Sequence, residues 1–185
     1  IFIIVSNPMD KILQMLNNNT NISKNALIGM GNILDTSRFK YHIYQELLNH
    51  NMEPSMNITA EVIGLHTDKD MIPLINYAKV DKVFVKNIFT KDILDKIVQD
   101  TKNGGATITN LMGTSACYSP AASITELVEC IIHDSKKVLS CSTLLNGEYG
   151  IHNKCIGVPV IIGKTGIEKI MNYDLNNEEL LKLQK

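Results

Sequence analysis

The sequence predicts a chain that begins as an α/β fold and continues as α+β, with the change near residue 30. Three observations predict this class. The chain opens with the β-branched apolar run Ile1-Phe-Ile-Ile-Val5, which is typical of a buried parallel strand. A second short apolar run, residues 26–29, follows one helix-length segment later. Further on, two apolar runs flank Asn146-Gly147, and this arrangement predicts a hairpin of antiparallel strands.

The first fifty residues are predicted to alternate strands and helices. A strand over 1–6 ends before Pro8, and because proline is tolerated in the first turn of a helix, we expect a helix over 8–17. After a polar loop, residues 26–29 form the second strand. A long helix is predicted from about 33 to 50.

The middle of the chain is predicted to return to strands and then to a helix. Residues 58–65 and 71–86 alternate or run apolar with turn residues between them, which indicates strands. Thr90 is a typical N-cap for the next helix, whose apolar residues have helical spacing. The pair Gly104-Gly105 is expected to interrupt or bend that helix.

The last part of the chain is predicted to contain a helix, a hairpin and a short final helix. The helix runs over about 119–133, where Ser119-Pro120 provides its start. Strands over 138–145 and 155–162 form the two arms of the hairpin. Asn176 and Glu179 have the spacing of a capping box for the final helix.

Composition excludes several function classes. The chain has 185 residues, enough for a sizeable core, and its net charge of −1 gives no electrostatic case for binding nucleic acid. No apolar run reaches the length of a membrane span. The cysteines form no CxxC pair, so no metal site is expected, and we interpret them as buried, reduced thiols of a cytoplasmic protein. They are Cys117, Cys130, Cys141 and Cys155.

Two glycine patterns resemble nucleotide motifs but are incomplete. Gly29-Met-Gly31 begins like a dinucleotide-binding fingerprint and lacks the third glycine at the required spacing. Gly163-Lys-Thr-Gly166 lacks the leading glycine and the length of a phosphate-binding loop, so we predict a turn.

Three polar residues suit a reaction on a small charged acid. Asp35 and Arg38 lie three residues apart and so share one face of the predicted helix. His66 follows a strand-like run about 30 residues later. An arginine binds a carboxylate with two parallel hydrogen bonds, and a histidine exchanges a proton near neutral pH. An aspartate beside the histidine fixes its tautomer and favours its charged form.

Asp35 and Arg38 stand within one of six ordered blocks that resemble the lactate and malate dehydrogenases, the NAD-dependent 2-hydroxyacid dehydrogenases. The resemblance covers essentially the whole chain. The blocks that carry it are Val5-Ser-Asn-Pro-Met-Asp10, Leu34-Asp-Thr-Ser-Arg-Phe39, Asn103-Gly-Gly-Ala106, Tyr118-Ser-Pro-Ala-Ala-Ser123, Leu144-Leu-Asn-Gly-Glu-Tyr-Gly150 and Gly157-Val-Pro-Val-Ile-Ile-Gly163.

The resemblance implies three catalytic roles. His66 is the general acid/base, Asp35 orients it, and Arg38 binds the substrate carboxylate. Each residue also has a structural alternative: a histidine at a strand end, an acidic residue favoured by the helix dipole, and a surface salt-bridge residue. Lys40 could not replace Arg38, because a point charge lacks the fork of donors.

The resemblance also assigns residues to the cofactor and the rest of the substrate. Asn7 is expected to hydrogen-bond the substrate oxygen or the nicotinamide ribose, and Met30 and Pro120 to lie near the nicotinamide. Ala116 stands where lactate enzymes usually carry a hydroxyl residue beside the substrate. A turn residue before proline is the alternative for Asn7, and a core methionine is the alternative for Met30.

The sequence departs from the family at one sensitive place. After the histidine, the family usually has glycine, aspartate, one further residue and methionine. Here His66-Thr-Asp-Lys-Asp-Met71 has threonine instead of glycine and one extra residue. A glycine often marks a torsion that other residues resist. We therefore expect the turn after His66 to bulge.

The implied fold is the C-terminal domain of this family with the last strands of a dinucleotide-binding sheet. We predict a remnant of the dinucleotide-binding domain over 1–30 and the substrate-binding, catalytic domain over 31–185. Because the chain starts within a strand, we expect that it lacks the first half of the enzyme. By itself it should therefore neither bind NADH tightly nor oxidise malate.

The implied function is NAD-dependent interconversion of malate and oxaloacetate by hydride transfer. The expected cofactor is NAD, the expected ligand is a 2-hydroxy or 2-oxo acid, and the expected assembly is a homo-oligomer, a dimer or tetramer, without nucleic acid or membrane partners. One alternative is lactate dehydrogenation, since Cys141-Ser-Thr-Leu-Leu145 resembles lactate enzymes of parasitic protists. The other is an inactive fragment that acts only in assembly through the open sheet edge at 1–6.

Overall fold

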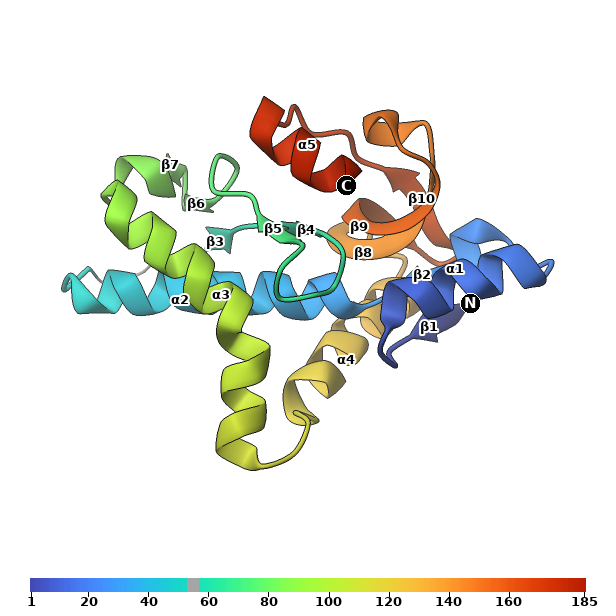
Figure 1. The fold of residues 1–185 in the computed structure, drawn as a ribbon, viewed down its shortest axis with the longest axis horizontal. Coiled ribbons are helices and arrows are strands. Elements are labelled where there is room, and N and C mark those ends of the chain that lie inside the picture. Colours follow the sequence, from blue (N-terminus) through green and yellow to red (C-terminus); the bar gives the residue numbers. More distant parts are fainter. Residues whose placement is uncertain (53–56) are drawn as a thin grey trace.

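A computed structural model describes residues 1–52 and 57–185 and has an α/β architecture, as predicted. Its main sheet has seven strands in the order β1-β2-β8-β9-β4-β5, with β10 paired to β9 (Figure 1). Three more strands form a small sheet in the order β3-β6-β7. The strands are β1 (Phe2–Ile4), β2 (Leu27–Gly29), β3 (Ile58–Thr59), β4 (Val62–Gly64), β5 (Met71–Pro73), β6 (Lys79–Val80), β7 (Val83–Phe84), β8 (Lys137–Asn146), β9 (His152–Gly163) and β10 (Gly166–Ile170).

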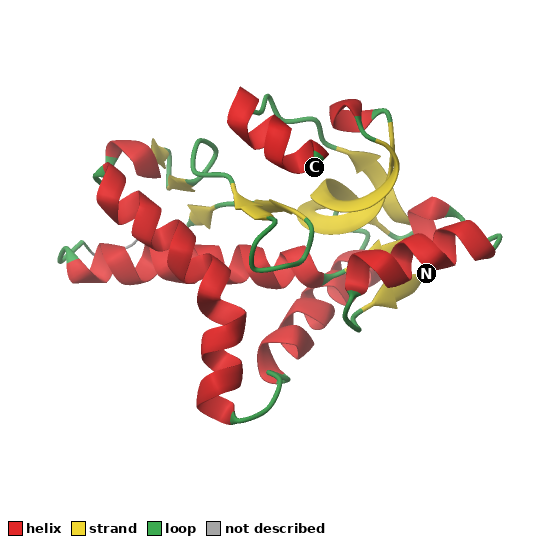
Figure 2. Cartoon of the chain, in the orientation of Figure 1, coloured by secondary structure: helices red, strands yellow, loops and turns green. Residues whose placement is uncertain are grey.

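Helices surround the sheet, and the predicted long helices are all present (Figure 2). They are α1 (Met9–Asn19), α2 (Gly31–Asn49), α3 (Lys91–Met112), α4 (Tyr118–Ile132) and α5 (Asn177–Gln184), with short 3-10 turns η1 (Lys24–Ala26), η2 (Val85–Asn87) and η3 (Glu148–Gly150). The predicted capping box of the last helix is confirmed, since Asn176 and Glu179 each bond the other's backbone.

The change of strand direction occurs where the sequence predicts it. β1 pairs in parallel with β2, whereas β2 pairs antiparallel with β8 through Gly29 and Ser142. The expectation that the first strand is buried is wrong. β1 is the edge of the sheet, with β2 as its neighbour, and Phe2 is 53% exposed.

The predicted hairpin is confirmed and forms the centre of the core. β8 and β9 pair antiparallel over their length, with Cys141 opposite Val158, and both of these side chains are fully buried. The chain between them contains η3, so the turn is longer than Asn146-Gly147 alone. The predicted turn after β9 is also confirmed, and it leads into β10, which the sequence analysis did not identify.

The two predicted strand regions in the middle of the chain are each divided. Residues 58–65 form β3 and β4, and residues 71–86 form β5, β6 and β7 with part of η2. The break after β5 is a turn in which the backbone N–H groups of Tyr77 and Ala78 both donate to the carbonyl of Leu74. The division lets β4 and β5 join the main sheet while β3, β6 and β7 pair separately.

The glycine pair in α3 does not interrupt the helix, which runs unbroken from Lys91 to Met112. Figure 1 shows that the axis of α3 bends partway, so the bend that we predicted is present. The first half packs against α2 with Ile97 and Thr101 buried, while Leu111 near the end is exposed. The far half of α3 therefore projects from the body of the protein beside α4 (Figure 1).

Three of the four cysteines are buried as predicted, but Cys117 is exposed because it lies in the loop just before α4. All four are free thiols. Across residues 1–52 and 57–185, no helix is both long and apolar enough to cross a membrane. Over the same ranges, no group of three histidine, cysteine, aspartate or glutamate side chains is placed to hold a metal ion.

Candidate active site

The three polar residues singled out from the sequence meet at the buried carboxylate of one of them, Asp35. Asp35, in the first part of α2, is 0% exposed. Its Oδ2 accepts a hydrogen bond from Nδ1 of His66 at 2.6 Å, and its Oδ1 accepts one from Nη1 of Arg38 at 3.3 Å. The spacing that places Asp35 and Arg38 on one helical face is therefore confirmed, and the fold adds His66 from 31 residues away.

The backbone around His66 is held by neighbouring elements. His66 follows β4, which pairs with both β5 and β9. On α2, the side chain of Asn32 is fully buried and donates from Nδ2 to the carbonyl of Gly64 at the end of β4, at 3.1 Å. The first residue of α2, Gly31, lies against the imidazole, since a Cβ there would stand 2.4 Å from Cγ of His66. Only a glycine lets the ring approach the helix so closely.

The surroundings of His66 favour its charged form. Burial of the ring lowers the pKa of His66, but the hydrogen bond and negative charge of Asp35 raise it, and the charge of Asp10 adds to this effect. The nearby positive charge of Arg38 acts in the opposite direction. The net result is a pKa above the ordinary value of 6.5. Since Asp35 accepts the bond from Nδ1, Nε2 is the nitrogen left to exchange a proton.

Arg38 reaches the site through a gap between α2 and α3. Its side chain is 13% exposed and passes the glycine pair of α3. A Cβ on Gly104 would lie 3.1 Å from Cδ of Arg38, and one on Gly105 would lie 3.4 Å from Nη1. Among the described residues, nothing hydrogen-bonds the buried Nε of Arg38. The guanidinium is therefore oriented by one bond to Asp35, with donors left for a ligand.

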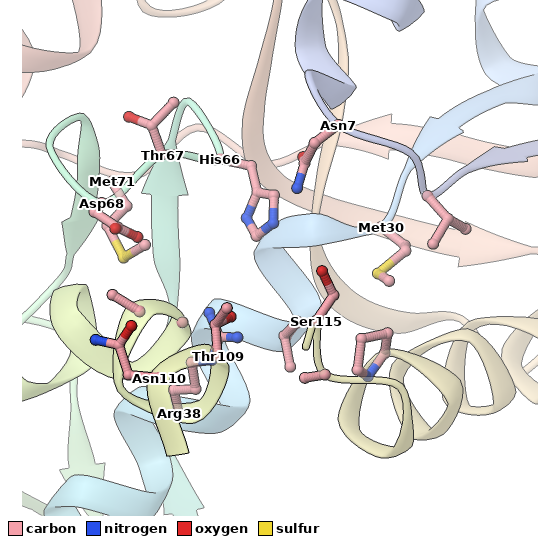
Figure 3. Close-up of a pocket in the computed structure, with 16 residues that line it drawn as sticks. Asn7, Met30, Arg38, His66, Thr67, Asp68, Met71, Thr109, Asn110 and Ser115 are labelled. Carbon is pink, nitrogen blue, oxygen red and sulfur yellow. The ribbon is translucent and has the colours of Figure 1, made fainter. Parts of the chain in front are cut away.

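A pocket of about 580 Å³ opens in front of these residues (Figure 3). Figure 3 shows side chains entering it from α2, from α3 and from the loops around Asn7 and His66. Six of the seven predicted site residues line it, and the seventh, Asp35, lies behind His66 and Arg38. The lining residues are Val5, Asn7, Met30, Leu34, Arg38, His66, Thr67, Asp68, Met71, Gly105, Ala106, Thr109, Asn110, Ser115, Ala116 and Pro120.

Several of these residues were missed from the sequence. Ser115 lines the pocket next to Ala116, so a hydroxyl is present one position before the place where lactate enzymes are expected to carry one. Thr109 and Asn110 come from the projecting half of α3. Thr109 lies four residues after Gly105 on the same helix, so helical spacing from the glycine pair could have indicated it. Asn110 has the same spacing from Ala106, which also lines the pocket.

The turn after His66 closes without glycine. Thr67 is not among the residues with positive φ, so the threonine does not need the backbone torsion that a glycine would permit. Its hydroxyl donates to Oδ2 of Asp70 at 2.7 Å and accepts from the backbone N–H of Asp70 at 3.1 Å. The carbonyl of Thr67 accepts a bond from the N–H of Met71 at 3.1 Å. The extra residue is thus accommodated in a hydrogen-bonded turn that also places Asp68 on the pocket wall.

Replacing Gly31 by alanine is expected to displace His66 from Asp35, because the new Cβ would overlap the imidazole. Helix propensity alone predicts the opposite sign for stability, since alanine is better than glycine by about 1 kcal/mol. NMR of the imidazole nitrogens should show loss of the Nδ1 hydrogen bond. Gly104→Ala is the matched control, because its Cβ would meet the aliphatic part of Arg38 instead. Unchanged His66 signals in Gly31→Ala would contradict the packing described here.

Comparison with known proteins places this geometry in context. Residues 33–185 match a family described as the lactate/malate dehydrogenase, alpha/beta C-terminal domain. A malate dehydrogenase of Flavobacterium johnsoniae is 45% identical over 179 residues, which cover 97% of this chain and 56% of that protein. The chain thus spans little more than half the length of this curated relative.

Solved structures give the same result. The malate dehydrogenase from Salinibacter ruber superposes with a TM-score of 0.91 at 35% identity, over 98% of this chain and 58% of that one. The lactate dehydrogenase from Eimeria maxima, solved with NADH and oxamate, superposes with a TM-score of 0.89 at 34% identity, over 98% of this chain and 55% of that one. The likeness therefore extends across both the first strands and the pocket.

Proposed function

The chain belongs to the lactate/malate dehydrogenase family, as a match to its C-terminal domain, and from this premise we propose that it supplies the substrate site of an NAD-dependent malate dehydrogenase. The reaction is the interconversion of malate and oxaloacetate. The observation that carries the proposal is the junction at Asp35, which joins one proton-exchanging ring and one guanidinium beside a single pocket.

In this proposal His66 moves the proton. In the reducing direction, Nε2 of the protonated ring gives its proton to the substrate carbonyl oxygen, and in the oxidising direction the neutral ring takes it from the hydroxyl. Asp35 holds Nδ1 throughout and stabilises the imidazolium. A pKa raised above 6.5 keeps the proton donor populated near neutral pH.

Arg38 binds the substrate carboxylate next to the reacting carbon. Its remaining donors can form two parallel bonds to a carboxylate, which fixes both the position and the rotation of the acid. The carboxylate of Asp35 bonds both Arg38 and His66. The residue that binds the substrate and the residue that donates the proton therefore keep a constant position relative to each other.

The pocket residues also suit the nicotinamide end of NAD. Val5, Met30 and Pro120 give the pocket an apolar wall, and Asn7 adds an amide that can bond a ribose hydroxyl or the substrate oxygen. These are the groups that a flat ring with one polar edge requires. When bound, NAD would accept or supply the hydride. Met30 and Pro120 would then orient the nicotinamide ring, and Asn7 would hydrogen-bond the ribose hydroxyl or the substrate oxygen next to it.

Malate is the preferred substrate. The malate dehydrogenase of Flavobacterium johnsoniae described above favours it, and so does Ala116 in the place of a hydroxyl residue. Lactate is the second candidate, because the Eimeria maxima structure, a lactate dehydrogenase, is nearly as similar in fold. Ser115 is the residue by which this pocket could still offer a hydroxyl to the acid.

The remaining parts of the proposal concern organisation. We propose that residues 1–30 belong with a dinucleotide-binding part and 31–185 with the substrate part, although β2 and β8 share one sheet. The exposed edge of β1 suits pairing with further strands in the working enzyme, and a homo-oligomer in the cytoplasm is the proposed form. Assembly without catalysis is disfavoured by the intact Asp35 junction.

The test is to join this chain to the part of the Flavobacterium johnsoniae malate dehydrogenase that it does not cover. We expect the fusion to oxidise NADH with oxaloacetate at a higher kcat/KM than with pyruvate. The chain alone serves as the control and should show neither turnover nor tight NADH binding. A fusion that folds and binds NADH but reduces neither acid would contradict the proposal, and a preference for pyruvate would support the lactate alternative.

A further inference from the structure

A second carboxylate, which is partly buried, lies next to His66 and comes from a different element. Asp10, at the start of α1, accepts a bond from the backbone N–H of His66 at its Oδ2, at 2.8 Å. Its Oδ1 accepts a bond from the hydroxyl of Ser142 on β8, at 2.6 Å. Asp10 therefore ties α1 to the loop after β4, 56 residues away, and to the central hairpin, 132 residues away.

His66 is thus held from two sides by negative charge. Asp35 bonds its ring and Asp10 bonds its backbone, and both carboxylates attract a protonated imidazole. The positive group that faces it is Arg38 from α2. The charged residues of its own loop, Asp68, Lys69 and Asp70, are exposed to solvent and are therefore more strongly screened.

We propose that Asp10 is a positioning residue for the proton transfer at His66, holding the backbone of residue 66 and stabilising the protonated ring through its own charge. The role rests on the proposed function, since it concerns the same acid/base. The proposal goes further because it gives α1 and β8 a part in setting the position and the pKa of His66. The Asp35 junction does not include these two elements.

The bonding pattern of Asp10 favours its ionised form. Partial burial, the largest effect, and the negative charge of Asp35 raise the pKa of Asp10, whereas the bonds from Ser142 and from the backbone of His66 lower it, as does attraction to the His66 ring. The net pKa of Asp10 lies above its ordinary value, and the two bonds limit this rise. Both short bonds are donated toward the carboxylate, so neither oxygen needs a proton. An ionised Asp10 in this partly buried position is screened less by solvent than a charge on the surface, and it acts on His66 from within hydrogen-bond distance of its backbone.

Glu61 provides a matched comparison. It is a buried carboxylate, and its Oε2 accepts a bond from the hydroxyl of Ser140 at 2.5 Å. Ser140 and Ser142 lie two residues apart on β8, and burial raises the pKa of Glu61 as well. The charges that act most strongly on the pKa of His66 are those of Asp35, Asp10 and Arg38, and Glu61 is not one of these. Glu61→Gln therefore removes the charge of a carboxylate bonded to a β8 serine, as Asp10→Asn does. It should not change the pKa of His66.

Asp10→Asn isolates the charge. The asparagine oxygen can still accept from the N–H of His66, and its amide can donate to the oxygen of Ser142, so both contacts can persist. We expect the pKa of His66, measured by NMR titration of the 185-residue chain without substrate or cofactor, to fall in Asp10→Asn and to stay unchanged in Glu61→Gln. Asp10→Glu, which restores the charge, should keep the pKa nearer that of the parent.

Equal pKa values in the parent and Asp10→Asn would overturn the proposal, and so would an equal fall in Glu61→Gln. If Asp10→Asn fails to fold, Asp10→Glu decides, because a folded Asp10→Glu with the pKa of an ordinary histidine contradicts the charge effect. In the fusion enzyme, the alkaline limb of oxaloacetate reduction should move to lower pH in Asp10→Asn. Because the titration needs no turnover, an inactive fusion would refute the proposed function without deciding the role of Asp10.

Discussion

Replacing His66 by asparagine in the fusion enzyme is expected to lower turnover by about 10²–10⁴-fold, the range that acid–base transfer commonly supplies. The asparagine amide can still donate to Asp35, so the junction loses its proton exchange and keeps a hydrogen bond at the same place. NADH binding, followed by its fluorescence, should change little, because the pocket residues proposed to hold the nicotinamide, Asn7, Met30 and Pro120, are unchanged. His133→Asn is the matched control, since His133 is exposed at the end of α4.

The same histidine sets the expected pH dependence. Reduction of the oxo acid requires protonated His66, so its rate should fall as pH rises through the pKa of that ring. Because Asp35 and Asp10 raise this pKa above 6.5, the fall should occur at higher pH than for an ordinary histidine. Oxidation of malate needs the neutral ring and should rise over the same interval. If His66→Asn has near-normal turnover and its reduction rate falls at the same pH as in the parent, His66 is not the acid/base.

Replacing Arg38 by lysine is expected to lower kcat/KM for oxaloacetate by about 10–100-fold, through a higher KM and a lower kcat. Lysine keeps the positive charge but cannot form two parallel bonds, and hydrogen bonds to charged groups contribute about 1.5–3 kcal/mol. Lysine has one ammonium group in place of the guanidinium, so it is also expected to weaken the bond to Asp35 that Nη1 makes in the parent. Steady-state kinetics with oxaloacetate and with pyruvate measure the effect.

Lys40→Arg is the control for this exchange, because Lys40 lies on the same helix and does not line the pocket. We expect its kinetic constants to match those of the parent. Unchanged constants in Arg38→Lys for both acids would show that Arg38 does not bind the carboxylate. A loss for oxaloacetate alone would instead indicate that Arg38 contacts the second carboxylate, which pyruvate lacks.

Local sequence patterns were sufficient for much of the fold. The spacing of apolar residues predicts α2 and α4 to within two residues, and the Asn176–Glu179 capping box is present as predicted. The Asp35–Arg38 pair could also be predicted, because three residues of α-helix bring two side chains onto one face. The assignment of His66 came from the resemblance to a family, since its partner lies 31 residues away.

By itself the sequence therefore determined the long helices, the central hairpin, their order and the short-range pairs, because helical and strand periodicity depends on neighbouring residues. It did not determine β10 or the division of the middle strand regions, which depend on pairing between strands. Tertiary structure alone decided the contacts between distant elements. It exposed Phe2 by placing β1 at the sheet edge, and it brought Asp10 to both His66 and Ser142. The physical reason is that such contacts depend on how the whole chain buries its apolar surface. No local pattern encodes a hydrogen bond between residues 132 positions apart.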